Sequence, residues 1–170
     1  MSLIYTPKKF DPRELISPKI YELCGDDALY MYHPLVLEGA DQISIEFGGF
    51  ICNTWWSPRL MAKYGRHRFR GLRAKNQVIG ARLSAHKIGI KKTNKSERYG
   101  LVPYSAIDGV TPNLPIKELH EHMRKDMKFW GKFFKRIETH KSNGQYITWF
   151  HGDSKPHKYS AANVIRFFKP

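Results

Sequence analysis

Hydrophobic residues follow a helical spacing in the first third of the chain. Residues 11–14 (Asp-Pro-Arg-Glu) combine a capping aspartate, a proline and a glutamate three positions later, which predicts a helix start and a capping box. That helix should end by Gly25. Residues 35–47 follow a proline and predict a second helix, which Gly48-Gly49 should end. Its apolar residues at roughly helical spacing are Leu35, Ala40, Ile43 and Phe47.

The middle of the chain has weaker periodicity. Residues 50–55 leave the glycine pair with an apolar pattern that predicts a strand. Residues 57–83 show no clean period and are rich in Arg, Gly and Lys, which predicts a long ordered loop. Pro115 then opens a third helix, expected over residues 116–131.

The last third contains three short runs of apolar, β-branched or aromatic residues, at 133–138, 145–151 and 163–168. The turn residues 142–144 (Ser-Asn-Gly) separate the first two runs and predict a hairpin. Helices followed by a small antiparallel sheet indicate an α+β fold, with the helices packed on the sheet. The length of 170 residues favours one domain, residues 1–170.

The composition is that of a globular protein. Hydrophobic residues make up 41% and charged residues 26%. No apolar run approaches the roughly 18 residues of a membrane span. The first residues lack the charged-then-apolar order of a signal peptide, so we expect synthesis in a cytoplasm. Two cysteines, Cys24 and Cys52, form no disulfide framework and are expected to be buried free thiols.

The net charge is the second strong signal. Lys and Arg number 29 against 15 acidic residues, which gives +14. Such a field attracts polyanions, and the candidates are nucleic acid and a cell wall that bears anionic polymers. The alternative is a solvated surface that serves solubility. The chain contains no zinc finger or similar recognition motif, so any nucleic-acid binding is expected to be non-specific.

Three distant segments offer the residues of one metal site. They contain His86 (in Ser84–Gly89), Asp108 (in Ala106–Asp108) and His151 (in Trp149–Asp153). Two imidazoles and one carboxylate are a common ligand set for a catalytic zinc that keeps a position open for water. His151 and Asp153 share one face of a predicted strand. Asp153 can therefore orient the histidine ring or contact substrate.

Each of these residues also has a simpler interpretation. A lone histidine among the eight in the chain is usually structural or exposed, and Asp108 can cap a turn at Gly109. Spacing alone leaves these alternatives open.

The order Ser84-x-His86-x-x-Gly89, Ala106-x-Asp108, Trp149-x-His151-x-Asp153 resembles the LAS-type zinc peptidases, in their small phage-encoded branch. These are the D-Ala-D-Ala carboxypeptidases and the phage L-Ala-D-Glu endopeptidases. The resemblance covers most of the chain and includes an Asn-x-Trp turn at Asn53 and a Ser-Gly-Leu-Arg-like turn that ends at Arg73. It implies a fold of the Hedgehog/D-Ala-D-Ala-peptidase type.

The resemblance also implies roles. His86, Asp108 and His151 would bind Zn²⁺, and Arg73 would grip a substrate carboxylate. Further substrate contacts would come from Ser84, Asn53 and Trp55. The implied function is zinc-dependent hydrolysis of peptidoglycan stem peptides, with anionic cell-wall polymer as partner and a phage particle as a place of incorporation.

The sequence departs from the family in two places. Residues 91–105 form a basic, turn-rich insertion between the first two ligands, and Thr148 stands where many members carry a glutamate base. Asp153 or Glu138 would then act as base or orienting acid. The alternative is a catalytically silent virion protein that keeps the fold and binds other virion proteins or nucleic acid through basic loops.

Overall fold

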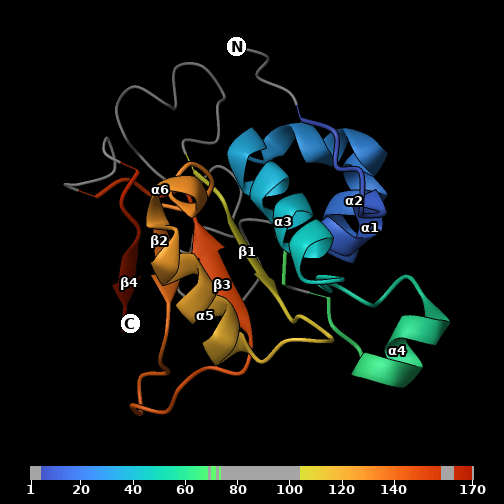
Figure 1. Cartoon of the computed structure of the whole chain (residues 1–170). Helices are drawn as coiled ribbons and strands as arrows, with labels where there is room; N and C mark the ends of the chain where they lie inside the picture. Colours follow the sequence, from blue (N-terminus) through green and yellow to red (C-terminus); the bar gives the residue numbers. More distant parts are fainter. Residues whose placement is uncertain (1–4, 69, 72, 74–103, 158–162, 170) are drawn as a thin grey trace.

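The chain folds as a mixed α+β structure, with helices in its first half and a small sheet together with further helices in its second (Figure 1). The computed structural model describes residues 5–68, 70–71, 73, 104–157 and 163–169. The predicted insertion at 91–105 therefore lies outside the described residues, except for its last two positions. The helices are α1 (Pro12–Leu15), α2 (Pro18–Cys24), the 3₁₀ helix η1 (Gly25–Met31), α3 (Pro34–Glu46), α4 (Pro58–Tyr64), α5 (Ile116–Lys125) and α6 (Met127–Trp130).

The sheet has four strands in the order β1-β3-β2-β4. Their bounds are β1 Ala106–Gly109, β2 Arg136–Glu138, β3 Phe150–Asp153 and β4 Arg166–Phe168. Strand β3 pairs antiparallel with both β1 and β2, whereas β2 and β4 are parallel. The α+β class is confirmed, but the sheet is mixed and not antiparallel throughout, because β4 returns beside β2 in the same direction.

The first predicted helix is two helices. Ile16 and Ser17 are extended, as expected before Pro18, and they separate α1 from α2. Asp11 caps α1 by accepting a hydrogen bond from the backbone N–H of Arg13. Glu14 is buried and interacts with the backbone N–H of Cys52. The aspartate of the predicted capping box therefore caps the helix, whereas the glutamate is buried in the core and does not complete the box.

The second predicted helix is α3, which ends before two glycines with φ of 73° and 136°. The strand predicted at 50–55 is wrong, since within it only Ile51 pairs, by an isolated bridge to Val110. Part of the predicted 57–83 loop is a helix, α4. Ser57 caps it by accepting from Leu60 N, and Pro58 occupies its first turn.

The third predicted helix breaks at Asp126, whose backbone (φ −126°, ψ 56°) leaves the helical region. Its side chain then caps α6 by accepting from Phe129 N at 3.2 Å. The predicted hairpin is present as β2 and β3, but both strands are shorter than expected. The segment between them contains one isolated bridge, His140 to Tyr146.

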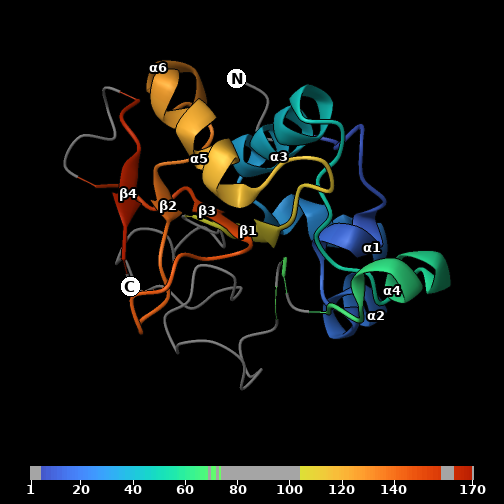
Figure 2. The same cartoon turned by 60° about the horizontal axis from the view of Figure 1, so that its bottom comes forward.

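Helices α3, α5 and α6 lie on one face of the sheet, as Figure 2 shows. That face supplies Ile107, Ile137 and Phe150 to a core that also takes in the buried faces of α3 and α5. Among the described residues, no helix has the length and apolar character needed to cross a membrane. Both cysteines are free, Cys52 buried and Cys24 half-buried.

Two glycines bring aromatic rings against the strand backbone on this core face. A Cβ at Gly109 would lie 2.4 Å from the ring of Phe50. A Cβ at Gly152 would lie 2.6 Å from Phe150 and 2.7 Å from Phe134. The phenyl rings therefore occupy the volume that side chains would fill at these two positions.

Candidate metal centre

The sheet face opposite the core carries a group of charged side chains. Residues that alternate with the core residues must point to this side, because successive side chains in a strand face opposite ways. The registers Asp108↔His151 and Arg136↔Asp153 place two such pairs side by side on neighbouring strands. The charged strand residues of this face are Asp108, Arg136, Glu138, His151, Asp153 and, on β4, Arg166.

Asp108 and His151 meet directly. Asp108 Oδ1 lies 2.6 Å from His151 Nδ1, and both side chains are about 15% exposed. The other ring nitrogen, Nε2, lies 3.8 Å from Asp153 Oδ2. Burial lowers the pKa of His151, but the charge of Asp108 and hydrogen bonds to both carboxylates outweigh it and raise the pKa to about 10. The imidazole is therefore held between two carboxylates.

Asp153 is fully buried and is held by Arg136 through two contacts. Arg136 Nε and Nη2 donate to its two oxygens at 2.9 and 2.5 Å. Burial raises the pKa of Asp153, but hydrogen bonds from His151 and Arg136 outweigh it, so the pKa stays below its ordinary value. A paired, ionised carboxylate of this kind orients its neighbours and is a poor proton acceptor. Of the two roles that the sequence allows Asp153, the geometry favours the orienting one.

Glu138 lies on the same face and is half-buried. Burial raises its pKa; the charge of His151 lowers it, and the charges of Asp108 and Asp153 raise it. The net rise moves this carboxyl toward the range in which a general base works near neutral pH. Glu138 is thus the better of the two predicted bases.

Arg73 differs most from its predicted role. Its residue is 7% exposed, and Nη2 lies 3.3 Å from Asp108 Oδ2. A substrate carboxylate would have to compete with Asp108 for this guanidinium. The structure therefore makes Arg73 a partner of a predicted metal ligand, whereas the resemblance implies a substrate anchor.

Asn53 and Trp55, both predicted to contact substrate, use their polar atoms inside the fold. Asn53 Nδ2 and Trp55 Nε1 donate to the carbonyl of Ile16 at 3.1 and 3.0 Å. Asn53 Oδ1 accepts from Arg70 N at 2.9 Å. Arg70 O in turn accepts from Asp108 N at 2.7 Å. These contacts place Asn53 behind Asp108, where it braces the backbone, and the substrate contacts of Asn53 and Trp55 stay a prediction.

The sequence did not single out Arg136 or Phe168. The guanidinium carbon of Arg136 lies 4.9 Å from the centre of the Phe168 ring, and that ring lies 6.4 Å from His151. The alternation of Arg136 and Glu138 around a buried isoleucine could have placed both on one face of a strand. That Arg136 pairs with Asp153 follows only from the β2–β3 register, which no local sequence pattern predicts.

The donor chemistry fits part of a zinc site. A carboxylate oxygen and an imidazole nitrogen converge, and a second carboxylate lies behind the imidazole, which is the usual orienting arrangement. His86 and Ser84 lie outside the described residues. Within the described ranges, no group of three or more His, Cys, Asp or Glu side chains could hold a metal ion.

Comparisons with known protein families, with curated proteins and with solved structures find no match to this chain.

Proposed function

We propose that this protein is a zinc-dependent hydrolase of peptidoglycan stem peptides, with a fold of the Hedgehog/D-Ala-D-Ala-peptidase type and a phage origin. His86, Asp108 and His151 would hold the ion. The proposal rests on the sequence motifs and on one contact, the 2.6 Å approach of Asp108 Oδ1 to His151 Nδ1.

That contact supports the proposal because it joins two of the three motif residues across a strand pair. Asp108 and His151 are separated by more than 40 positions, yet they are directly opposite in the β1–β3 register. Asp153 faces the second nitrogen of the ring, so the donor nitrogen and its orienting carboxylate are on opposite sides of the imidazole. A structural histidine needs only one such partner.

A zinc ion in this position would supply Lewis-acid activation of water and of the scissile carbonyl. The chain's own residues would do the rest. Arg136 fixes Asp153, Asp153 fixes the ring of His151, and Asn53 fixes the backbone at Asp108 through Arg70. Glu138, on the adjoining strand, is the group that would accept a proton.

Zinc stoichiometry on the purified protein tests this function. We expect about one zinc per chain by elemental analysis, with loss of the metal in His151→Ala and retention in His122→Ala. His122 is an exposed histidine on α5 and serves as the matched control. Unchanged zinc content in His151→Ala would defeat the site. Digestion of peptidoglycan by the zinc-loaded protein is the second assay.

The Arg73 contact favours a second candidate. The guanidinium predicted to grip substrate is buried against Asp108, so the charged face carries paired residues where a substrate carboxylate would enter. The same fold could then serve as a catalytically silent virion protein. Absence of zinc after reloading at neutral pH would select this candidate.

A further inference from the structure

A shallow pocket lies beside α4, and none of its lining residues belongs to the charged sheet face. Its volume is about 360 Å³. The residues that matter for its chemistry are Ile51, Trp56, Arg59, Leu60, Lys63 and Tyr64. Apolar and aromatic groups line it together with two cations, which is a combination typical of ligand sites.

The chain segment that carries most of this pocket is basic. No acidic residue occurs between Glu46 and Glu97 in the sequence. Arg59 and Lys63 on α4 are exposed, as are Arg66 and Arg68 just beyond it. In the described part of the chain, no carboxylate forms an ion pair with any of these four side chains. An unneutralised cluster of this kind attracts an anion.

Cations and aromatic rings alternate at the pocket. Arg13, held by Asp11, places its guanidinium carbon 4.8 Å from the centre of the Trp56 ring. Lys63 Nζ lies 5.1 Å from the centre of the Tyr64 ring. Aromatic rings interleaved with Lys and Arg are the usual means by which proteins hold unpaired bases and their phosphates.

We propose that the α4 pocket binds single-stranded nucleic acid, with one base against Tyr64 and Leu60 and the adjoining phosphates on Arg59, Lys63 and Arg66. A duplex keeps its bases stacked inside and cannot place one in the pocket. A polyol-phosphate wall polymer supplies the charge but has no planar group for the rings. The apolar and aromatic lining therefore favours a nucleic acid over a wall polymer.

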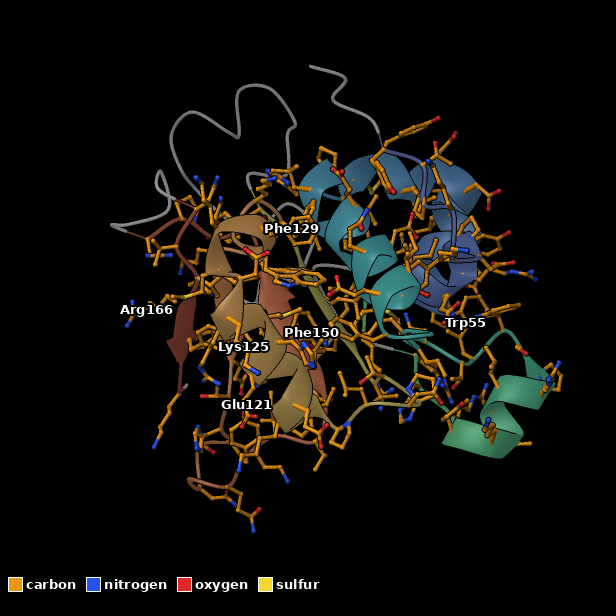
Figure 3. The ribbon with its side chains drawn as sticks, viewed as in Figure 1. Trp55, Glu121, Lys125, Phe129, Phe150 and Arg166 are labelled. Carbon is orange, nitrogen blue, oxygen red and sulfur yellow. The ribbon has the colours of Figure 1, made fainter. Side chains whose placement is uncertain are left out.

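This site goes beyond the proposed hydrolase and is independent of it. The pocket is lined largely by residues of α4, and none of its lining residues is a candidate metal ligand. Figure 3 shows Trp55, which precedes α4, well apart from Lys125 on α5. Its residues can be changed while all candidate metal ligands stay intact.

Fluorescence anisotropy with a labelled oligothymidylate of about 12 nucleotides tests the proposal, a length within the usual site sizes. Arg59→Gln/Lys63→Gln is compared with Lys125→Gln/Lys128→Gln. Each variant removes two exposed lysine or arginine charges, so the net charge is equal. For single strands, each lost phosphate contact lowers the salt-dependence slope by about 0.7. We expect the magnitude of this slope to fall by about 1.4 in Arg59→Gln/Lys63→Gln and to change little in Lys125→Gln/Lys128→Gln.

A third variant, Tyr64→Leu, tests the base contact. Loss of base stacking should weaken binding about fivefold or more with an unchanged salt slope. Equal effects of the two double variants would overturn the proposal, because attraction would then be diffuse. Competition by soluble polyglycerol phosphate as strong as that by unlabelled oligonucleotide would also overturn it, in favour of a wall polymer. Circular dichroism of each variant verifies that it is folded.

Discussion

Replacement of Glu14 by glutamine should stabilise the protein in alkaline solution. Glu14 is 8% exposed, and burial raises its pKa from 4.5 to about 8 even though the Cys52 backbone N–H favours the ionised form. In the unfolded chain the carboxyl ionises near its ordinary value. Between about pH 4.5 and 8 the unfolded chain therefore loses this proton while the folded protein keeps it.

The sign and size of the effect follow from linkage. Because the folded state binds the extra proton, stability falls as the pH rises through this window and stays low above it. The difference between about 8 and 4.5 corresponds to about 5 kcal/mol at about 1.36 kcal/mol for each unit of pKa. Glutamine has the same shape, carries no proton to lose, and keeps an oxygen for the Cys52 N–H.

Urea unfolding of both proteins, followed by circular dichroism from pH 4 to 9, measures this difference. At pH 4 the two free energies of unfolding should nearly agree, and at pH 8.5 the variant should be more stable by several kcal/mol. The other titrating groups are the same in both proteins, so their contribution to the pH dependence cancels in the difference between the two curves. Parallel curves across the whole range would refute the reasoning, since Glu14 would then ionise alike in both states.

Three further changes are expected to alter the same free energy of unfolding. Burial lowers the pKa of His120 from 6.5 to about 4, so the free energy of unfolding should fall by about 3 kcal/mol as the pH falls through that window. In His120→Gln the free energy of unfolding should change less with pH over the same range. Gly39→Ala should destabilise by about 1–3 kcal/mol despite better helix propensity, because its Cβ would lie 2.7 Å from Phe134. Arg136→Ala should cost about 1.5–3 kcal/mol by removing the charge-assisted hydrogen bonds to buried Asp153, which keeps the Lys155 N–H and His151 beside it, and a loss below 1 kcal/mol would contradict that.

Helix α3 shows what local sequence signals can predict. This helix begins at a proline, has apolar residues at helical spacing and ends just before a glycine pair. Each of these signals depends only on residues close in the sequence, and the observed bounds agree with the prediction. Helix α4 had equally local signals in Ser57 and Pro58. Its seven residues contain too few apolar positions to show a helical period, so the sequence predicted this segment as part of a loop.

Non-local pairing explains the remaining errors. The segment 50–55 has a strand-like pattern, but its backbone bonds to α1 and to residue 67: Asn53 N donates to Glu14 O, and Thr54 N donates to His67 O. The sequence placed His151 and Asp153 on one face because that depends only on alternation along β3. The approach of Asp108 to His151 depends on the β1–β3 register. Before the structure, only the chemistry of a zinc ligand set and the family resemblance grouped these two residues.

The glycines at positions 109 and 152 follow Asp108 and His151 directly in the sequence. Phenyl rings fill the space on the core side of both positions. Any side chain larger than hydrogen there would push the strand outward and carry the neighbouring Asp108 or His151 with it. In a library of variants, these two positions should tolerate substitution as poorly as the charged residues beside them, although glycine itself has no side chain to contribute. Transplanting the charged face to another scaffold would accordingly require moving Phe50, Phe134 and Phe150 with it.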